Sequence, residues 1–538
     1  MRNILLVFAL WISSWNIHSQ TPFNIQLEPI DIEGVGGIQS YAFGQHNGKW
    51  LIVGGRLDGL HQRQPFAAFD ASGNNTQLMV IDPVAGQSWA TPLSSLSVGM
   101  REQLSSTNME FNQEGDYLYV IGGYGYSSTK GEHTTYANLT AINVPATIEA
   151  IVNGTDFAEN FRQITDPQFA VTGGHLNKIG AVYYLVGGQK FEGSYNPMGP
   201  DHGPGFTQEY TDAIRKFEID DDGTTLNIRH LEGITDTENL HRRDYNVVPQ
   251  IMPNGEEGLT AFSGVFQKTA NVPFLNCVNI DAEGYEVNNS FSQYYNHYHC
   301  AVLPVFGAEQ NEMHTVFFGG IAQYYEADGV LVQDDEVPFV KTIARVTRTA
   351  DGTMTEYKLP VEMPALLGAS SELIPIEGLS KYANGVLKLD DLEADTTLVG
   401  YIYGGISSSA KNIFWSNTGA QSEASSQIFK VFVVKEKTVG IDEINLQSIA
   451  DLRMQMYPNP YNGVLNIDFQ MAYQSEVELQ IFDIEGKIVH EQKVPKNETV
   501  VGKNHLSLTL KEMEYGTVLL VKLATKKDHL TQKLIIND

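Results

Sequence analysis

Apolar runs that end in glycine pairs recur along the first three quarters of this 538-residue chain. In YLYVIGG, Tyr117 to Gly123, β-branched and aromatic residues form a continuous run that a glycine pair follows. Such runs are typical of buried strands, and the glycines favour a tight backbone turn at the strand end. Related copies end at Gly55, Gly188, Gly320 and Gly405, and a degenerate copy has Ser263 before Gly264. Six copies of one strand type predict a repeat architecture.

Each copy lies in a predicted unit of four antiparallel strands, a to d. Another strand lies upstream of each apolar run, as at Leu104 to Phe111 and Tyr245 to Met252. This upstream strand is strand a, and the apolar run that the glycine pair ends is strand b. Two further strands follow, joined by hairpin turns such as Asp220 to Gly223 and Asp351-Gly352. Six such units predict an all-β fold, a six-bladed β-propeller over residues 21–438.

The sixth unit lacks an outer strand. After Gly405 it shows one clear strand, Gln427 to Val434, and then the pattern breaks. The segment Phe23 to Ile30 precedes unit 1 without a local partner and resembles the outer strand of unit 3, Leu226 to Ile234. We therefore expect the N-terminal segment to close blade 6, which removes two open sheet edges.

The glycine pairs, together with Asp82-Pro83 and Trp89 in unit 1, resemble the kelch repeat family. The resemblance implies a kelch-like propeller in which an arginine commonly opens strand a, near the axis. Arg101 and Arg242 fit that place, and His297 occupies it in blade 5.

The pattern changes in a predicted linker over residues 439–455. Beyond it, residues 456–538 form short strands without glycine pairs, and strict alternation from Val477 to Ile481 predicts a small Ig-like β-sandwich. The opening Tyr-Pro-Asn-Pro at Tyr457, an Ile-Phe-Asp strand before Gly-Lys, and the final Lys-Leu-Ile-Ile resemble the type A C-terminal sorting domain of the type IX secretion system. The resemblance implies that the secretion machinery is a partner, with release or attachment at the cell surface.

Residues 1–20 are predicted to be a signal peptide. Arg2 supplies a positive start, Ile4 to Trp15 is mostly apolar, and Ser19 suits a cleavage point. No other segment approaches the ~20 apolar residues of a membrane span, so we expect no transmembrane segment. The predicted location is secreted or attached to the outer cell surface.

The net charge of the chain excludes some classes of partner. The formal net charge is −29, which disfavours nucleic acid and anionic lipid as partners.

The two cysteines fall on different predicted strands. Cys277 falls on strand c of blade 4 and Cys300 on strand a of blade 5. A disulfide needs Cα atoms within ~7 Å, whereas strands are ~4.8 Å and packed sheets ~10 Å apart. We therefore predict two free, buried thiols.

The starts of strand a and the loops after the glycine pairs lie on one face, around the central mouth. The polar residues at these starts are the predicted ligand-binding residues: Arg101, Gln103, His241, Arg242, Arg243, Asp244, Tyr295, His297, Tyr298 and His299. The loops add His61, His202, Tyr324-Tyr325 and Phe414-Trp415. Aromatic platforms beside charged donors suit a sugar or a peptide. Alternatively, the arginines only pair with acidic neighbours across blades.

Two features bear on catalysis. His297 and His299 lie two residues apart and could bind a metal with a third ligand, or else bond to the backbone. Tyr298 and Cys300 resemble the surroundings of copper-radical oxidases, which share the propeller fold, but the other ligands are not found in this sequence. No nucleophile–base–acid set, phosphate loop or HExxH motif is present.

The sequence thus favours a binding propeller for a carbohydrate or protein ligand. It predicts no cofactor and leaves a divalent metal open. The alternative is an enzyme on the same face, either a metal-dependent oxidase or a sugar epimerase resembling the six-bladed N-acetylneuraminate mutarotases, because fold alone does not transfer activity. A purely structural surface protein is the third hypothesis.

Overall fold

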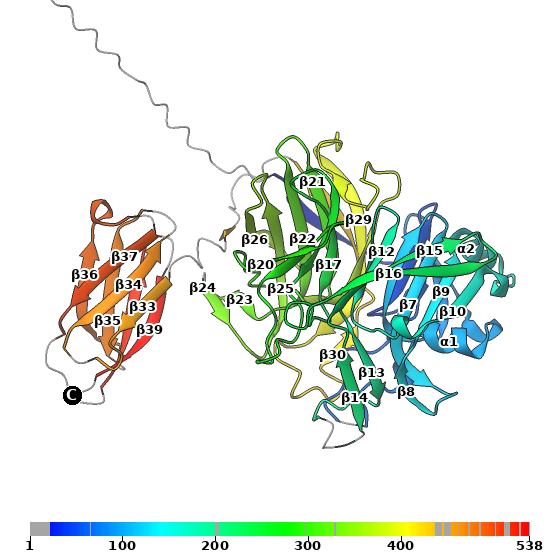
Figure 1. Cartoon of the computed structure of the whole chain (residues 1–538), viewed down its shortest axis with the longest axis horizontal. Coiled ribbons are helices and arrows are strands. Elements are labelled where there is room, and N and C mark those ends of the chain that lie inside the picture. Colours follow the sequence, from blue (N-terminus) through cyan, green and yellow to red (C-terminus); the bar gives the residue numbers. More distant parts are fainter. Residues whose placement is uncertain are drawn as a thin grey trace, which may run out of the picture.

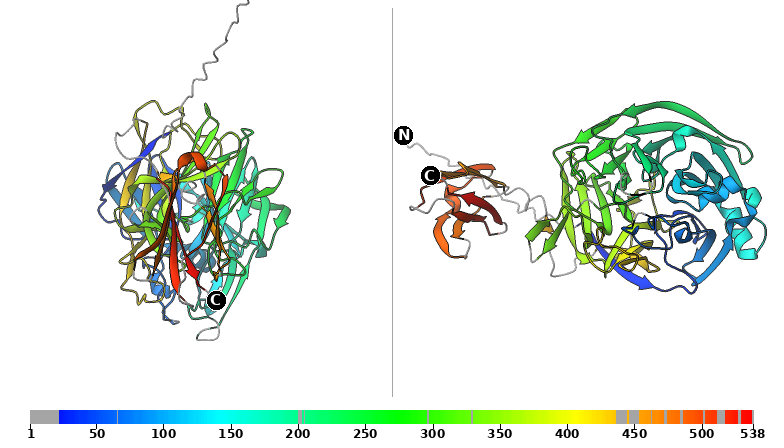
Figure 2. Two further views of the ribbon diagram at one scale, coloured as in Figure 1. Left: turned by 90° about the vertical axis from the view of Figure 1, so that its left-hand side faces the viewer. Right: turned by 90° about the horizontal axis from the view of Figure 1, so that it is seen from below.

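The computed structural model describes residues 22–435 except 65, 200–202, 204, 296 and 328–329, the backbone of residues 444–445, and residues 453–536 except 462, 472–473, 484–485, 501, 511–516 and 527–528. The predicted signal peptide and most of the predicted linker lie outside these residues. Within them, six sheets surround a common axis, and the chain passes round the disc in sequence order (Figure 1; Figure 2, right).

Blades 1, 3 and 4 are antiparallel sheets of four strands in chain order. Blade 1 consists of β2 (Ala42–His46), β3 (Lys49–Val53), β4 (Gln77–Asp82) and β5 (Gln87–Pro92). Blade 3 consists of β11 (His175–Ile179), β12 (Val182–Val186), β15 (Ala213–Asp221) and β16 (Leu226–Thr235). Blade 4 consists of β17 (Asn246–Ile251), β18 (Glu257–Phe262), β19 (Cys277–Ile280) and β20 (Tyr285–Asn288). The hairpin predicted at residues 220–223 is confirmed between β15 and β16.

Blades 2 and 5 carry additional strands. Blade 2 consists of β6 (Thr107–Glu114), β7 (Tyr117–Ser127), β9 (Asn138–Asn143) and β10 (Phe161–Thr165), extended through β8 (Glu132–Thr135) to β13 (Gln189–Gly193) and β14 (Phe206–Tyr210). Blade 5 consists of β21 (Val302–Gly307), β22 (Glu312–Ile321), β25 (Phe339–Arg348) and β26 (Met354–Glu362), with β28 (Leu387–Lys388) beside β21 and β32 (Ile444–Asn445) beside β26. A separate hairpin joins β23 (Tyr324–Ala327) to β24 (Val330–Gln333). The extra strands belong to long loops on one face of the disc and to the blade edges.

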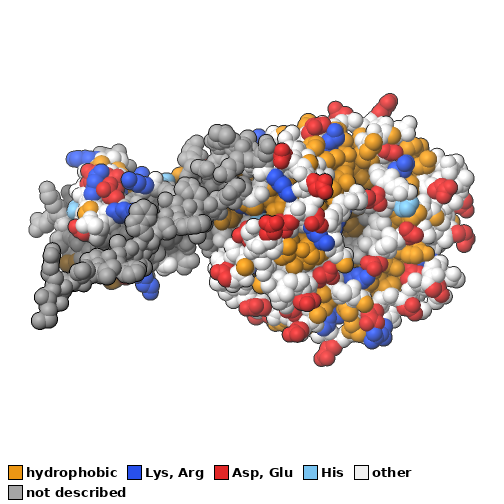
Figure 3. Space-filling view, turned by 90° about the horizontal axis from the view of Figure 1, so that it is seen from above, with side chains coloured by type: hydrophobic (Ala, Val, Ile, Leu, Met, Phe, Trp, Pro, Cys, Tyr) orange, Lys and Arg blue, Asp and Glu red, His pale blue; other side chains and the backbone are white. Residues whose placement is uncertain are grey.

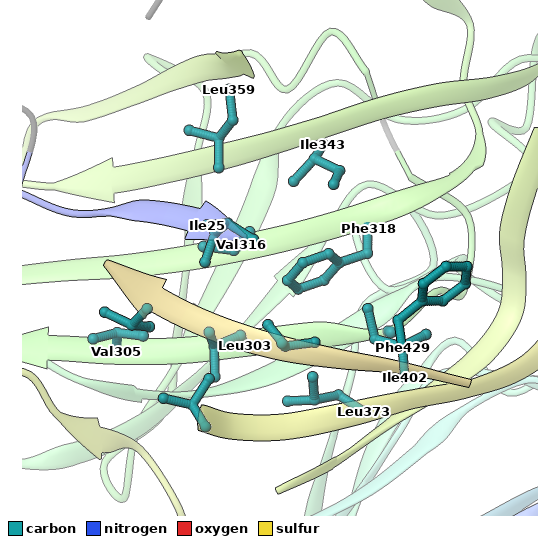
Figure 4. Packing of buried hydrophobic residues seen from close by; sticks show 14 of the residues in the cluster. Ile25, Leu303, Val305, Val316, Phe318, Ile343, Leu359, Leu373, Ile402 and Phe429 are labelled. Carbon is teal, nitrogen blue, oxygen red and sulfur yellow. The ribbon is translucent and has the colours of Figure 1, made fainter. Parts of the chain in front are cut away.

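The N-terminal strand closes the ring. Blade 6 consists of β27 (Leu366–Pro375), β29 (Thr396–Ser408), β31 (Ile428–Val434) and, outermost, β1 (Asn24–Ile30), with the short β30 (Ser422–Ala424) on β29. The register of β1 runs from Asn24 opposite Val434 to Ile30 opposite Ile428. Figure 4 shows Ile25 among buried side chains from blades 5 and 6. The predicted closure is confirmed.

The glycine pairs join neighbouring blades rather than simply ending strand b. In blades 2, 5 and 6 the strand continues through the pair, so the prediction of a strand end is wrong there. Gly122 and Gly123 have φ of 65° and 89°. A Cβ on Gly122 would lie 2.0 Å from the carbonyl oxygen of Val171 in the next blade, and the Gly123 N–H donates to that oxygen at 2.9 Å. Only glycine permits this approach at these dihedral angles.

A closed ring of six backbone hydrogen bonds surrounds the axis. At each strand a start, one N–H donates to the carbonyl of the corresponding residue in the neighbouring blade, at 2.6 to 3.4 Å. In donor order the ring residues are Ser40, Ser370, His299, Asp244, Gly173 and Asn108, and Asn108 donates to Ser40. We call this set the axial ring. It ties all six blades together at their innermost point.

Two α-helices occupy connections that were predicted to be strand or loop. The predicted strand from Leu104 begins only at Thr107, because Val98–Leu104 forms α1. Helix α2 (Val144–Asn153) starts at a cap in which Asn143 accepts from the Ala146 N–H, and it ends at Gly154 with φ of 66°. Apolar residues of α2 pack into the core shared by blades 1 and 2. The helix therefore covers apolar surface beside the blade edges.

The C-terminal module is a sandwich of two antiparallel sheets. One sheet contains β33 (Arg453–Tyr457), β34 (Leu465–Met471) and β37 (Gly502–Leu508). The other contains β36 (Ile488–Val494), β35 (Val477–Asp483), β38 (Val518–Ala524) and β39 (His529–Ile535). Val477, Leu479 and Ile481 are fully buried, as their alternation predicts. Strand β37 was not predicted.

In the described part of the chain, no helix combines the length and apolar character needed to span a membrane.

Candidate functional site

A cavity of about 480 Å³ opens on the face where the loops after strand b gather. All six blades contribute lining residues, and five members of the axial ring form its floor. We call it the loop-face cavity; Figure 2, right, shows the disc from this side. Its position at the central mouth agrees with the face predicted from the strand directions.

One wall of the loop-face cavity is aromatic. The rings of His61 and Tyr195 lie 4.9 Å apart, and Phe69 contacts both Tyr124 and Tyr195 at 5.5 and 5.6 Å between ring centroids. The Tyr124 hydroxyl donates to the Gly193 carbonyl at 2.7 Å and accepts from the Tyr195 N–H at 3.1 Å. These bonds join loops from blades 2 and 3, so the wall is a fixed surface.

The three arginines of the cavity differ in their partners. The Arg56 guanidinium donates to Asp58 and, at 2.7 Å, to Asn74 Oδ1. Arg243 pairs with Asp244 and donates to the Tyr210 hydroxyl at 3.0 Å; although burial opposes it, Asp244 raises the pKa of Arg243.

Arg63 has a different setting. Its guanidinium lies 4.5 Å from the centre of the Trp415 ring and donates to the Pro197 carbonyl at 2.6 Å. No carboxylate among the described residues pairs with it. Arg63 is therefore the cavity arginine whose charge is available to a ligand.

Four of the ten predicted ligand-binding residues line the loop-face cavity: Arg243, Asp244, Tyr298 and His299. Asp244 and His299 belong to the axial ring, which places them on the floor. The His299 Nε2–H donates to Glu372 Oε1 at 2.8 Å. Of the loop residues, His61, Phe414 and Trp415 also line the cavity, whereas Tyr324 and Tyr325 lie outside the lining. His202 is outside the described residues.

The other six predicted residues lie outside the lining: Arg101, Gln103, His241, Arg242, Tyr295 and His297. Gln103 is fully buried in blade 2, where its side chain donates to the Val120 and Asn138 carbonyls and accepts from the Thr140 hydroxyl. Arg101 is on α1, before the strand that was expected to carry it. Both residues therefore lie on a helix and not at the start of strand a.

Arg242 and His297 are also fully buried. Arg242 is 1% exposed, donates to the carbonyls of Asn239, Ser263 and Asn276, and lies over the Phe274 ring at 4.1 Å. His297 Nδ1–H donates to the Gly319 carbonyl at 2.7 Å, and burial lowers its pKa to about 4. These contacts hold the ends of strands together inside blades 4 and 5.

His241 has a local partner, whereas the buried Tyr295 hydroxyl has none among the described residues. The His241 ring stacks on Tyr210 at 3.8 Å, with Nδ1 2.7 Å from Asp212 Oδ1. Burial raises the pKa of the fully buried Tyr295. The described residues contain no group of three His, Cys, Asp or Glu placed to hold a metal ion.

Both cysteines are free and buried, as predicted. Cys277 begins β19, strand c of blade 4, and Cys300 lies two residues before β21, strand a of blade 5. Burial raises the pKa of each thiol to about 12. Neither is poised to react as a thiolate near neutral pH.

The residues that sequence reasoning missed come from the long loops. They are Arg56, Arg63, Phe69, Tyr124, Phe191 and Tyr195. Arg56 directly follows the glycine pair of unit 1 and Tyr124 that of unit 2, so position after the pair was an available signal. Arg63, Phe69 and Tyr195 carry no such signal.

A family model described as the secretion system C-terminal sorting domain matches residues 455–537. The chain therefore ends in a sorting domain of the type IX secretion system, which directs export to the cell surface or beyond. No curated protein matches the chain.

Among solved structures, the structure of YjhT is 11% identical, with a TM-score of 0.38, covering 75% of this chain and 99% of that one. The WD40 domain of SCAP from fission yeast is 9% identical, with a TM-score of 0.21, covering 96% and 91%. Dimeric latent PorU from Porphyromonas gingivalis is 10% identical, with a TM-score of 0.15, covering 79% and 43%. At these TM-scores none of the three supports an inference about function.

Proposed function

We propose that the exported propeller binds a carbohydrate in the loop-face cavity. One observation carries the proposal: the cavity brings together a fixed aromatic wall, the Arg63–Trp415 pair and hydrogen-bonding side chains at the axis. The apolar faces of a sugar pack on aromatic rings, and its hydroxyls bond to charged and amide groups. A volume of about 480 Å³ lies within the ~300–1,000 Å³ usual for small-molecule sites.

Trp415 is the residue on which this proposal depends most. It is 65% exposed, with Arg63 on its ring, so a large apolar surface faces solvent at the cavity mouth. Tryptophan is enriched at binding interfaces, and an exposed aromatic ring at a cavity mouth can serve as a platform for a ligand. A sugar ring stacked there would place its substituents toward Arg63.

Trp415→Ala should weaken glycan binding by about 2- to 13-fold, because an aromatic contact is worth about 0.5–1.5 kcal/mol beyond burial. A glycan array with the full exported chain identifies the sugar, and calorimetry measures its affinity. Phe66→Ala is the matched control, since Phe66 is 83% exposed on the loop of Arg63 but outside the cavity lining. Equal affinity in Trp415→Ala and wild type, or no glycan bound, would contradict the proposal; selective peptide binding would identify a protein ligand instead.

An enzyme on the same face is the second candidate, and His61 favours it. His61 lines the cavity, and burial lowers its pKa to about 4, so its ring is neutral at pH 7 and can form a hydrogen bond with a substrate hydroxyl. A sugar epimerase or mutarotase would interconvert the bound sugar, which proton NMR detects directly. A binding protein leaves the sugar unchanged.

We infer further that the sorting domain is of type A, consistent with its Tyr-Pro-Asn-Pro opening, and is removed during export. The propeller would then reach the cell surface as a separate binding module.

A further inference from the structure

A second cavity of about 440 Å³ lies on the axis at the opposite face, where strands a and b are joined by short turns in blades 1 to 5 and by residues 376–395 in blade 6. Figure 3 shows this face, hollowed at the centre of the disc. Strand a of every blade contributes to the lining, and we call the space the turn-face lumen. His299 of the axial ring lines both cavities, so the ring stands between the lumen and the loop-face cavity.

The turn-face lumen is lined by three carboxylates and two histidines. Glu110, Glu372 and Glu377 line it, and no lysine or arginine does so among the described residues. Glu110 is 2% exposed; its Oε1 accepts from the Gly174 N–H at 2.8 Å, and its Oε2 has no hydrogen-bond partner in the described part of the chain. A buried carboxyl oxygen without a donor is costly unless something satisfies it.

The two histidines of the lumen reinforce this acceptor character. His175 Nε2–H donates to the Tyr245 carbonyl at 2.5 Å, and burial lowers its pKa to about 3, so the ring is neutral and its Nδ1 carries only a lone pair. The His299 Nε2–H already donates to Glu372. The Glu372 carboxylate and the His175 Nδ1 therefore favour a ligand that brings hydrogen-bond donors.

We propose that the turn-face lumen binds a small primary ammonium ion, with Glu372 as the contacting carboxylate and Glu110 behind it in the wall. An ammonium group has three donors, no acceptor and a positive charge. The rings of Phe43 and Phe111, 5.3 Å apart, also line the lumen and suit the alkyl part of such a ligand. A metal ion fits less well, since no group of three metal-binding side chains occurs among the described residues.

The proposal predicts how the affinity for the ammonium ion depends on pH. Burial raises the pKa of Glu110 to about 8. The Gly174 N–H and Arg215 lower this pKa, and Asp244 raises it further. The Glu110 carboxyl is therefore neutral at pH 7. Burial lowers the pKa of His299, but Glu372 and Asp244 outweigh burial and raise it, while neutral His175 lies against its ring. A bound cation favours ionised Glu110 and neutral His299. Affinity should therefore rise from pH 7 to pH 9, with protons released on binding.

The test is calorimetry of the full chain with 1,4-diaminobutane at pH 7 and pH 9. We expect saturable binding, at least threefold tighter at pH 9, and a loss of tenfold or more in Glu372→Gln. Glu110→Gln should weaken binding and flatten its pH dependence. Glu114→Gln is the matched control: Glu114 is on the same strand β6, exposed and paired with Lys178, outside the lumen lining.

Three results would overturn the proposal: no saturable heat up to ~10 mM diamine, unchanged affinity in Glu372→Gln, or displacement of the diamine by Ca²⁺ or Mg²⁺ at equal concentration, which would identify a metal site. Melting curves check that each variant is folded. Should Glu110→Gln not fold, Glu372→Gln decides alone, because the Glu372 side chain is 14% exposed and its replacement by an amide keeps the shape.

Discussion

Arg242 and Arg243 are neighbours in the chain but have different roles, one inside a blade and one at the loop-face cavity. Arg242 turns into blade 4 and donates to three backbone carbonyls, whereas Arg243 faces the loop-face cavity and pairs with Asp244. Residue type and position near a strand start are the same for both. What separates them is the direction of each side chain, which depends on the backbone at the axis.

Arg242→Ala should lower the free energy of unfolding by about 2–4 kcal/mol, because it leaves buried carbonyls of Asn239, Ser263 and Asn276 without their donor. Urea unfolding measures the loss. Arg101→Ala on α1 is the control, with an expected change within about 0.5 kcal/mol. Normal stability of Arg242→Ala together with lost glycan binding would instead assign Arg242 to the ligand.

The site was predictable to the extent that strand direction determines it. Arg243, Asp244, Tyr298 and His299 were predicted because strand a must start at the central mouth. Gln103 and His297 were chosen by the same rule, but their side chains satisfy backbone groups inside the blades. Arg63 and Tyr195 could not be predicted, since long loops from different blades bring them to the cavity.

At the scale of elements, the repeat pattern predicted the strands well and the connections poorly. A strand buried on both faces leaves a long apolar run, so all six b strands were visible in the sequence. Helix α1 replaced the start of a predicted strand because Val98–Leu104 has no strong alternation and Ser97 caps it by accepting from the Met100 N–H. That cap was the one local sign of a helix.

The closing strand β1 gives the strongest prediction about an element. Deleting Phe23 to Ile30 removes the partner of β31 and two buried core residues, Phe23 and Ile25. The melting midpoint should fall far more than it does after deletion of residues 453–538, and the open edge of blade 6 should promote aggregation. Calorimetry and light scattering compare the two deletions. An unchanged midpoint without β1 would show that the ring closes by another contact.

At the scale of the molecule, the axial ring explains how six unequal blades form one disc. Loop lengths and extra strands vary between blades, but each blade gives one N–H and one carbonyl to the ring. Function can therefore vary in the loops without disturbing the axis. The two cavities lie on either side of this ring and differ in character: the loop-face cavity is aromatic with arginines, and the turn-face lumen is acidic.

The propeller and the sorting domain have separate cores. The C-terminal core runs from Met454 to Ile536, and no residue of it belongs to a propeller cluster among the described residues. Each module thus buries its own apolar surface, the condition for a domain that folds alone. In the segment between them, Asn445 and Ile444 pair with Tyr357 and Lys358 of β26.

Limited proteolysis of the full chain should therefore cut first between residues ~436 and 455, because connections between independent cores are the preferred sites of cleavage. The expected product is a resistant fragment of residues ~21 to 436, identified by mass spectrometry, with the melting midpoint of the intact propeller. The long loops of the loop-face cavity should be cut later, since hydrogen bonds such as Arg63 N–H to the Asn417 carbonyl, at 2.8 Å, join them. First cleavage inside a blade would contradict the two-module organisation. First cleavage in those loops would show that the aromatic wall is not fixed before a ligand binds.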